Sequence, residues 1–518
     1  MTSKLYPVGI QNFEKLRKDG YCYIDKTEKI YKLVKTGSYY FLSRPRRFGK
    51  SLLISTMEAY FQGKKNLFGG LAIEALEKDW KQYPVLHLDL NARKYDSEES
   101  LDRELDKHLE QWEKLYGSDY SDRAPEERFY HIIRMAYEQT GERVVILVDE
   151  YDKPMLQTIN NPELQDKYRN TLKPFYGVMK SMDGYIKFAL LTGVTKFGKV
   201  SVFSDLNNLE DISRNPYYAD ICGISEEELL KNFSEDIQEL ASANGQTFDQ
   251  ACERLRTDYD GYHFCHGGIG IYNPFSLLNT FKSRQYGSYW FETGTPTYLV
   301  ELLKKHKYDL YRMAHEKTTS DVLDSIDASS TNPIPVIYQS GYLTIKGYIP
   351  EPRIYELGFP NREVEEGFLK FLLPYYTPLQ ETESGFAIWD FISDVKSGDI
   401  DGFMERLQSF LADCPYEMAK DVELHYQNVL FIVFRLAGLY TKVEYHTSRG
   451  RIDLVLQTDS YVYVMEFKLD GSAEQAIAQI EEKQYTLPFA KDSRKVYIIG
   501  VNFSSGTRNI DKWIVKKL

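Results

Sequence analysis

The sequence predicts an α/β protein with a parallel sheet in its N-terminal half and a second α/β domain at its C-terminal end. From Tyr39 to Leu191, short apolar runs alternate with longer charged, helix-compatible stretches, and this order favours parallel strands joined by right-handed crossovers. From Arg451 onward, two apolar runs flank the turn Asp459-Ser460, which predicts an antiparallel pair. A mainly helical middle region joins the two parts.

The first strand, predicted at Tyr39–Leu42, leads into a loop that ends in Gly49-Lys50-Ser51 and then into an apolar helix. Backbone N–H groups at a helix N-terminus face phosphates, a lysine at this position reaches the β and γ oxygens, and the hydroxyl ligates Mg²⁺. This spacing therefore predicts a nucleotide loop, with a basic surface turn as the alternative. The pattern is partial, because Arg44 occupies the first glycine position of G-x-x-x-x-G-K-[ST].

The acidic end of a later strand favours the nucleotide interpretation. Val144–Val148 is an apolar run, as expected of a strand buried on both faces, and it ends in Asp149-Glu150. At such a strand end an Asp holds the Mg²⁺ shell, and a following Glu polarises the attacking water. A solvated strand end is the alternative interpretation, but the order and spacing of the two motifs favour an ATP site.

Two further strands complete the predicted sheet, at Tyr83–Leu90 and Ile186–Leu191. The latter ends at Thr192, which is a candidate for sensing the γ-phosphate, although a simple turn residue explains it as well. Three cations follow, Lys196, Lys199 and Arg214. One of them could act as a finger residue that stabilises charge during hydrolysis, and the sequence does not show which.

The N-terminal half resembles the AAA-ATPase-like family of bacterial proteins over most of Met1–Gly223. The matching stretches are Gly9-Ile10 with Phe13, Tyr23–Thr27, Arg44–Ser51, Val148–Pro154 and Leu191–Val194. The resemblance implies that the arginine-rich loop is usual, that the segment before the first strand lies against the nucleotide, and that ATP and Mg²⁺ are the cofactors. It implies these cofactor-binding residues: Arg46, Arg47, Gly49, Lys50, Ser51, Asp149 and Thr192, with Ser51 and Asp149 at the metal and Glu150 catalytic.

The middle of the chain is predicted to be helical from Ile224 to about Lys317, with Ser225 as the first helix cap. We interpret His263, Cys265 and His266 as part of a loop without metal. A small β unit, with Val336–Tyr338 as one strand, and two helices follow. The predicted domains span residues 1–223, 224–330, 331–420 and 421–518.

The C-terminal segment brings together the parts of a metal-dependent hydrolase. A helix is predicted at Glu423–Leu439, a strand carries Asp453, and the partner strand carries Glu466 and Lys468 on one face. Two carboxylates can hold Mg²⁺ against a phosphate while the lysine positions the attacking water. An exposed ion pair is the alternative for Glu466 and Lys468, but their apolar neighbours favour a site.

These residues resemble the PD-(D/E)XK nuclease superfamily, in the version fused behind AAA-ATPase-like domains. The resemblance covers about Asp421–Leu518, with Ile452 in place of the proline. It implies catalytic roles for Asp453, Glu466 and Lys468 and metal binding by Glu423, Asp453 and Glu466. Gln479 and Tyr485 are similar to the Gln…Tyr pair of RecB-like members, at a spacing of six rather than four.

Composition sets further bounds. The chain has 518 residues, enough for two to four domains, and its net charge of −12 argues against a nucleic-acid binder that uses its whole surface. The five cysteines are scattered, no apolar run approaches the length of a membrane span, and the N-terminus lacks a signal-peptide core, so we expect a cytoplasmic protein without a membrane partner. The sequence leaves open a homo-oligomer.

We therefore expect a protein that binds and hydrolyses ATP and whose C-terminal domain hydrolyses phosphodiester bonds in a nucleic acid, with DNA favoured, under ATP control. Two alternatives remain. One is an ATP-dependent switch or scaffold whose nuclease fold only binds nucleic acid. The other is a protein-interaction module with neither activity.

Overall fold

A computed structural model describes residues 4–117, 123–196, 206, 208–291, 299–300, 302–303, 306–313, 316–324, 332–377, 381–412, 422–438, 442–448 and 451–518. Within these ranges the side chains of residues 311, 381–387, 412, 422–427, 442–448 and 451–453 are not described. The chain forms two compact units. The first unit comprises residues 1–293 and 316–361, and the second comprises residues 294–315 and 362–518.

A five-stranded parallel sheet in the order β2-β3-β4-β1-β5 is the centre of the first unit. Its strands are β1 (Tyr39–Ser43), β2 (Val85–Asp89), β3 (Val144–Asp149), β4 (Ile186–Gly193) and β5 (Glu210–Asp211). The four longer strands confirm the sequence prediction. Every residue of β3 is buried, as its continuous apolar run requires.

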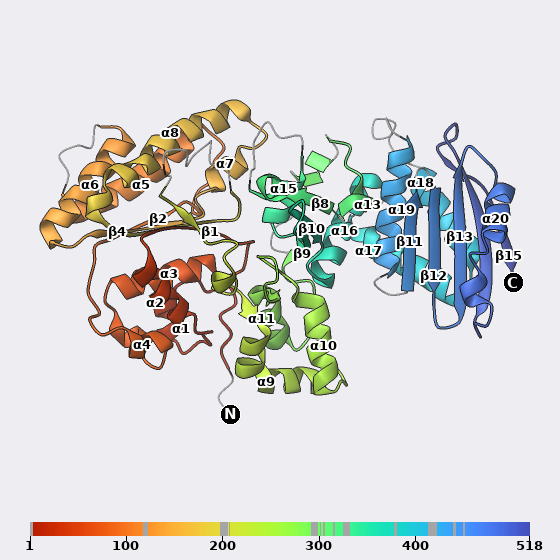
Figure 1. Cartoon of the computed structure of the whole chain (residues 1–518), viewed down its shortest axis with the longest axis horizontal. Coiled ribbons are helices and arrows are strands. Elements are labelled where there is room, and N and C mark those ends of the chain that lie inside the picture. The colour runs from red at the N-terminus through yellow and green to blue at the C-terminus, as the bar shows by residue number, and fades with distance from the viewer. Residues whose placement is uncertain are drawn as a thin grey trace. The chain divides into compact units, whose positions relative to one another are not determined.

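Helices cover both faces of this sheet (Figure 1). One face carries α5 (Glu99–Tyr116), α6 (Pro125–Thr140) and α8 (Pro162–Ser181), and the other carries α1 (Phe13–Lys18), α2 (Thr27–Thr36), α3 (Lys50–Phe61) and α4 (Ala72–Leu76). The short α7 (Lys153–Gln157) follows β3. Because β1 and β3 are separated in the sheet only by β4, the ends of all three strands meet at one edge.

A helical group and two small sheets, one of β6 and β7 and one in the order β8-β10-β9, belong to the rest of the first unit. Its helices are α9 (Glu226–Ala243), α10 (Phe248–Tyr259), α11 (Pro274–Ser283), α14 (Ser320–Leu323) and α15 (Ile334–Gln339). Its remaining strands are β6 (Ile224–Ser225), β7 (Ile271–Tyr272), β8 (Glu316–Thr319), β9 (Thr344–Ile349) and β10 (Ile354–Gly358). Ser225 accepts a bond from the Glu228 N–H in a capping box at the start of α9, which confirms the predicted cap.

The predicted strand at Val336–Tyr338 is wrong, because these residues lie in α15. A short apolar run has no periodicity that separates a buried strand from a buried helix, and Pro335 stands in the first turn, where proline favours a helix start. The strand of this region begins later, at Thr344.

The second unit contains a mixed five-stranded sheet in the order β11-β12-β13-β14-β15. Its strands are β11 (Lys442–Ser448), β12 (Arg451–Gln457), β13 (Tyr461–Leu469), β14 (Lys495–Ser504) and β15 (Asn509–Lys517), and its helices are α13 (Leu310–Met313), α16 (Arg362–Tyr376), α17 (Glu381–Ser397), α18 (Ile400–Ala412), α19 (Val422–Gly438) and α20 (Ala473–Glu482). Strands β12 and β13 form the predicted antiparallel pair, and β13 and β14 are parallel.

Alternate residues of β13 face different helices. Val462 and Val464 pack with Ile477 and Ile480 of α20 in one core cluster. On the other face, Tyr463 donates a hydrogen bond to the Val395 carbonyl of α17. By the two-residue period of a strand, Glu466 and Lys468 lie on the α20 face.

Candidate nucleotide and nuclease sites

The loop after β1 has the conformation that a phosphate-binding loop needs. Gly49 caps α3 with φ of 95°, a left-handed conformation that favours glycine. A Cβ added at Gly49 would meet no atom within 4 Å, so the space beside this glycine is open. Backbone N–H groups at this helix start can therefore face an anion.

Lys50 points from α3 toward the acidic end of β3. Its side chain is 3% exposed, and its Nζ lies 3.1 Å from the Arg44 carbonyl oxygen, 3.3 Å from that of Pro45 and 3.3 Å from Oε1 of Glu150. The fold thus brings together a lysine and a glutamate that are a hundred positions apart in the chain. Ser51 follows directly and is half-buried.

Asp149 is held by the neighbouring strand. Thr192, at the end of β4, donates a hydrogen bond from Oγ1 to Oδ1 of Asp149 at 2.7 Å, and both residues are buried. The Glu150 N–H also donates to Oδ1, at 3.1 Å. In this geometry the Thr192 hydroxyl orients the Asp149 carboxylate.

Asp152 is a polar residue of this edge that the sequence reasoning missed. Its carboxylate is fully buried and accepts hydrogen bonds from the Val194 N–H, the Thr195 N–H at 2.6 Å and the Thr195 hydroxyl at 2.5 Å. Burial and the nearby charge of Glu150 raise the pKa of Asp152, while the Thr195 donors act in the opposite direction. The signal for it was its position, only two residues after Glu150.

Arg44 is a buried clamp rather than a phosphate ligand. Only 1% exposed, its guanidinium donates to the carbonyl oxygens of Ser43 and Ser213, both at 2.8 Å, and to those of Tyr218 at 3.0 Å and Ala219 at 3.3 Å. Burial lowers the pKa of Arg44. The arginine that replaces the first glycine therefore fastens the loop to the segment after β5.

The other loop arginines lie at the surface. Arg46 and Arg47 are exposed, the guanidinium of Arg47 stands 4.8 Å above the Phe275 ring, and Trp290 Nε1 donates to the Arg46 carbonyl at 3.0 Å. Among the finger candidates, Lys196 and Arg214 are both paired with Asp324. Lys199 lies outside the described residues.

An apolar pocket adjoins the loop at Gly49. Its walls come from the segment before β1, from α3 and from the segment before α9, and they include Cys22, Tyr23, Ile24, Phe48, Leu52 and Ile221. The apolar lining suits a flat aromatic group such as a nucleobase. The sequence had placed the segment before β1 near a nucleotide only through the family resemblance.

The residues of this edge fit a magnesium nucleotide. A hydroxyl and a carboxylate, from Ser51 and Asp149, are the hard oxygen donors that Mg²⁺ prefers. The space beside Gly49 is open, and Lys50 supplies a cation next to this glycine.

In the second unit, Glu466, Lys468 and Gln479 form a chain of contacts. Glu466 is fully buried, and its Oε1 accepts a hydrogen bond from Lys468 Nζ at 2.7 Å. Lys468 Nζ also donates to Oε1 of Gln479 in α20, at 2.5 Å. The fold therefore brings Gln479 to the lysine, whereas Tyr485 lies after the end of α20 and packs against the core.

The position of α20 depends on a glycine of β14. Glu466 pairs with Gly500 in the parallel register, and a Cβ at Gly500 would come within 2.4 Å of the Ala473 carbonyl oxygen. The absence of a side chain there lets α20 approach the sheet closely enough for Gln479 to reach Lys468.

The other predicted residues of this site are located only by their backbone. Asp453 in β12 is directly opposite Glu466 in the register of the antiparallel pair, a pairing partner that the sequence had not specified. Glu423 belongs to α19, near its start. The side chains of Asp453 and Glu423 lie outside the described residues. Glu466 is a buried carboxylate next to a lysine, and Asp453 lies opposite it in register. These residue types suit a divalent metal with oxygen ligands.

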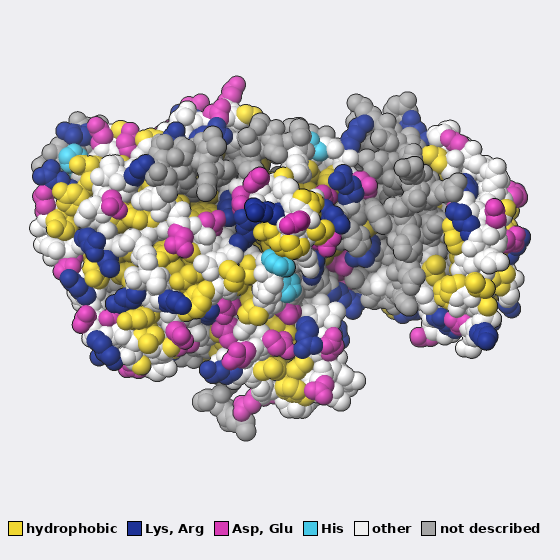
Figure 2. Space-filling view, in the orientation of Figure 1, with side chains coloured by type: hydrophobic (Ala, Val, Ile, Leu, Met, Phe, Trp, Pro, Cys, Tyr) yellow, Lys and Arg dark blue, Asp and Glu magenta, His cyan; other side chains and the backbone are white. Residues whose placement is uncertain are grey.

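The surface carries charges of both signs. On the face that Figure 2 presents, Lys and Arg side chains are interspersed with Asp and Glu over the described residues, in keeping with the net charge of −12. None of the helices in the described ranges has the length and apolar character needed to cross a membrane.

Comparisons with known proteins identify a family for each of two parts of the chain. Residues 7–203 match the family model described as predicted AAA-ATPase, and residues 421–513 match that of the PD-(D/E)XK nuclease superfamily. A curated relative, the uncharacterized protein in the vnfD 5′ region of Azotobacter chroococcum mcd 1, is 34% identical over 536 residues and covers all of both chains. A solved structure, the Aeropyrum pernix ORC2 protein in ADPNP–ADP complexes, aligns with 65% of this chain and 87% of its own at 11% identity, with a TM-score of 0.23. The chain thus belongs to the family of proteins that join a predicted AAA-ATPase domain to a PD-(D/E)XK nuclease superfamily domain.

Proposed function

We propose that the protein binds and hydrolyses ATP with Mg²⁺ in its first unit and cleaves phosphodiester bonds of DNA, with a divalent metal, in its second unit. ATP controls the cleavage. The observation that carries the nuclease part is the contact between the buried Glu466 carboxylate and Lys468, with Asp453 opposite in register. The two family matches support the pairing of activities within one chain.

In the ATP site, each residue has a separate task. Lys50 neutralises charge on the β and γ phosphates, and the N–H groups after Gly49 bind their oxygens. Ser51 and Asp149 would hold Mg²⁺, which when bound supplies charge stabilisation for phosphoryl transfer. Glu150 accepts the proton of the attacking water, and Thr192 keeps the Asp149 carboxylate in the required orientation.

In the nuclease site, Glu466, Asp453 and Glu423 would hold the metal, which when bound stabilises charge on the scissile phosphate. Lys468 positions the attacking water and stabilises the charge that develops on the phosphate oxygens. Its ammonium is aimed by two acceptors, Glu466 and Gln479, and an ammonium held from two sides is pre-organised for this task.

The direct test of the ATP part is isothermal titration of the purified chain with Mg-ATP, followed by phosphate release. We expect binding and hydrolysis in the native protein, and weakened binding with loss of hydrolysis in Lys50→Met. Binding without hydrolysis in the native chain would favour the alternative of an ATP-dependent switch.

The direct test of the nuclease part is cleavage of labelled DNA with Mg²⁺ or Mn²⁺. We expect cleavage by the native chain and its loss in Glu466→Gln. DNA binding that persists without cleavage under either metal would favour a scaffold whose nuclease fold only binds nucleic acid.

A further inference from the structure

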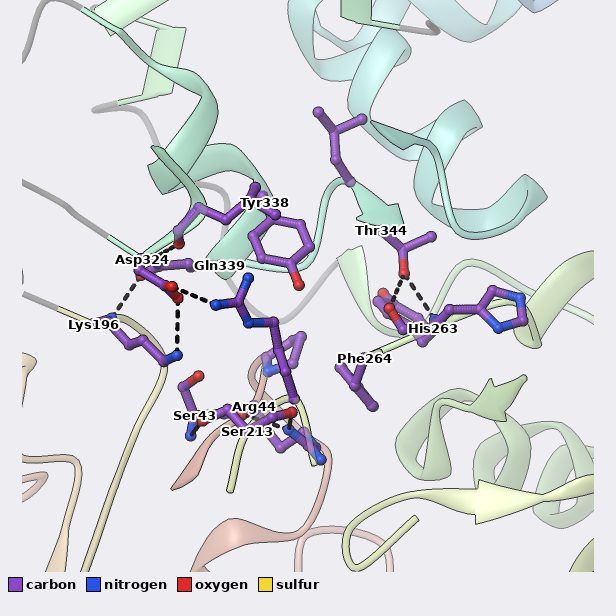
Figure 3. Close-up of a pocket in the computed structure, with 15 residues that line it drawn as sticks. Ser43, Arg44, Lys196, Ser213, His263, Phe264, Asp324, Tyr338, Gln339 and Thr344 are labelled. Atoms are coloured by element: carbon purple, nitrogen blue, oxygen red, sulfur yellow. Dashed lines mark hydrogen bonds and ion pairs between the residues drawn. The ribbon is translucent and has the colours of Figure 1, made fainter. Parts of the chain in front are cut away.

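A pocket of the first unit, separate from the apolar pocket described above, is lined by three cationic side chains. We call it the cation pocket. Its cations are Arg44 from the loop stem, Lys196 from the exit of β4 and Arg214 from the segment after β5. Figure 3 shows Asp324 beside Lys196 on one side of this pocket and Phe264 on the opposite side. The proposed activities use none of these side chains.

The cations of this pocket outnumber the carboxylates that contact them. Oδ1 of Asp324 lies 3.1 Å from Lys196 Nζ, and its Oδ2 accepts a hydrogen bond from Arg214 Nη2. Lys196 is also paired with Asp211. Among the described residues, no carboxylate contacts Arg44, whose Nη atoms donate to backbone carbonyl oxygens. Three positive charges therefore meet two negative ones, and the excess positive charge favours an anion in the pocket.

Hydrogen-bond donors in the lining are also left unused. Nε of Arg44 and Nη1 of Arg214 are buried and have no partner within the described part of the chain. The hydroxyl of Ser213 accepts from the Ser43 N–H at 2.9 Å, and its own proton is given no acceptor by any described residue. Buried donors are normally satisfied in folded proteins. Unused donors on the walls of one pocket therefore indicate a ligand that accepts hydrogen bonds.

The cation pocket is held in shape by contacts of its own. Gln339 accepts a hydrogen bond from the Lys196 N–H at 2.6 Å and donates to the Leu323 carbonyl at 2.5 Å. The Phe264 ring centroid lies 4.0 Å from Cζ of Arg44 and covers that guanidinium. A ligand thus meets cations that are already in position, which reduces the free energy that ordering of the site costs.

We propose that the cation pocket binds a phosphate group, either as inorganic phosphate or as a phosphate monoester. Arg214 Nη1 and the Ser213 hydroxyl donate to its oxygens, and Arg44 and Lys196 supply positive charge. The donors and cations come from separate segments, which suits a tetrahedral oxyanion better than a planar carboxylate. Asp324 holds two of the cations in place and, as a like charge, lowers the affinity for the ligand. This site is distinct from the nucleotide loop and does not depend on ATP hydrolysis.

Two substitutions change phosphate affinity in opposite directions. Arg214→Gln removes a donor and a positive charge, and Asp324→Asn removes the like charge while keeping the size of the side chain. The matched controls are Arg134→Gln and Glu138→Gln, because Arg134 and Glu138 form an exposed ion pair in α6 of the same unit. A gain of affinity in Asp324→Asn cannot result from misfolding, so this variant keeps the proposal testable if Arg214→Gln fails to fold.

The measurement is isothermal titration of the full chain with inorganic phosphate at constant ionic strength. All proteins carry Lys50→Met, which removes the lysine of the nucleotide loop as a competing phosphate site. We expect Arg214→Gln to weaken binding at least about tenfold, as for a lost hydrogen bond to a charged group. Asp324→Asn should tighten binding at least about fivefold. Arg134→Gln and Glu138→Gln should stay within about twofold, because exposed ion pairs contribute little.

A parallel titration with phenyl phosphate identifies the source of the phosphate group. Tighter binding than that of inorganic phosphate supports a phosphate monoester whose organic part contacts Phe264, and weaker binding supports free phosphate. Binding of neither compound, or binding that Arg214→Gln and Asp324→Asn leave unchanged, would overturn the cation pocket. Mg-ATP binding by the chain without Lys50→Met is measured separately, so a failure of the nucleotide site is distinguished from a failure of this pocket.

Discussion

The ammonium of Lys50 and the carboxylate of Glu150 lie 3.3 Å apart, from Nζ to Oε1, at the edge of the parallel sheet where β1 and β3 end. Both side chains are largely buried, so the ammonium and the carboxylate contact each other rather than water. A nucleotide site needs these charges for different steps: the cation binds phosphate, and the carboxylate activates water. Substitutions at the two positions should therefore have separable effects.

Glu150→Gln should leave Mg-ATP binding within about threefold of the native value and lower the hydrolysis rate about 100-fold or more, because general-base catalysis commonly contributes that much. Lys50→Met should weaken binding itself by at least about tenfold, a change of about 1.4 kcal/mol. Titration calorimetry and phosphate release give the two quantities. Lys18→Met, in an exposed ion pair with Glu14, is the control. Equal loss of binding in both variants would contradict these separate roles.

Thr192 offers a test of how Asp149 is oriented. Thr192→Val removes the hydroxyl that donates to Asp149 at 2.7 Å and keeps the shape of the side chain. Loss of a bond that orients a metal ligand commonly costs about 10- to 100-fold in metal affinity or activity. We expect a higher Mg²⁺ requirement for hydrolysis, with Thr192→Ser close to the native protein. A Mg²⁺ dependence that is unchanged in Thr192→Val would assign Thr192 another role.

Arg44 should matter for stability rather than for nucleotide affinity alone. Arg44→Met removes a donor from four carbonyl oxygens, and a buried acceptor left without a partner costs about 1–3 kcal/mol, partly offset by the removal of a buried charge. The Tyr218 carbonyl keeps the Ile221 N–H as a donor. We expect the free energy of unfolding to fall by about 2–4 kcal/mol. Chemical denaturation measures it, and the exposed Arg46→Met should remain within about 0.5 kcal/mol of the native chain. Equal stability of both variants would contradict the clamp.

Asp152 gives a pH-dependent prediction. Burial and the charge of Glu150 raise its pKa in the folded state above the ordinary value of about 3.9 for an unfolded chain. The folded state therefore binds this proton more tightly, so the stabilising contribution is complete below about pH 4 and is lost as the pH rises through the folded pKa. The free energy of unfolding of the native chain, minus that of Asp152→Asn, should therefore be larger at pH 4 than at pH 8. A difference that grows with pH would refute the raised pKa.

Much of this fold follows from local sequence patterns. Continuous apolar runs predict β3 and β4, and the run from Tyr461 predicts β13, because strands buried on both sides leave a clear signal. The short run at Val336–Tyr338 misled for the same reason, since a buried helix of similar length carries the same residues. The one local signal for a helix there is Pro335 in the first turn.

The site residues that belong to sequence motifs could be predicted. The residues whose roles depend on long-range contacts could not. Lys50, Asp149 and Glu150 could be chosen from spacing, and the antiparallel pairing of the strands that carry Asp453 and Glu466 from the turn between them. The role of Arg44 depends on carbonyl groups about 170 positions later in the chain. Long-range contacts of this kind leave no periodic pattern in the sequence. The sequence could show only that Arg44 departs from the first glycine of the G-x-x-x-x-G-K-[ST] pattern.

The central claim is that the contact between Glu466 and Lys468 belongs to a working nuclease site. The most direct test is cleavage of linear and circular DNA, with Mg²⁺ or Mn²⁺ and with or without ATP, by the native chain, by Lys468→Ala and by Lys512→Ala. Lys512 is an exposed lysine of the same sheet, paired with Glu474, and serves as the matched control. We predict metal-dependent cleavage by the native chain and Lys512→Ala, and its loss in Lys468→Ala. Cleavage that persists in Lys468→Ala, or that no metal elicits from the native chain, would contradict the account.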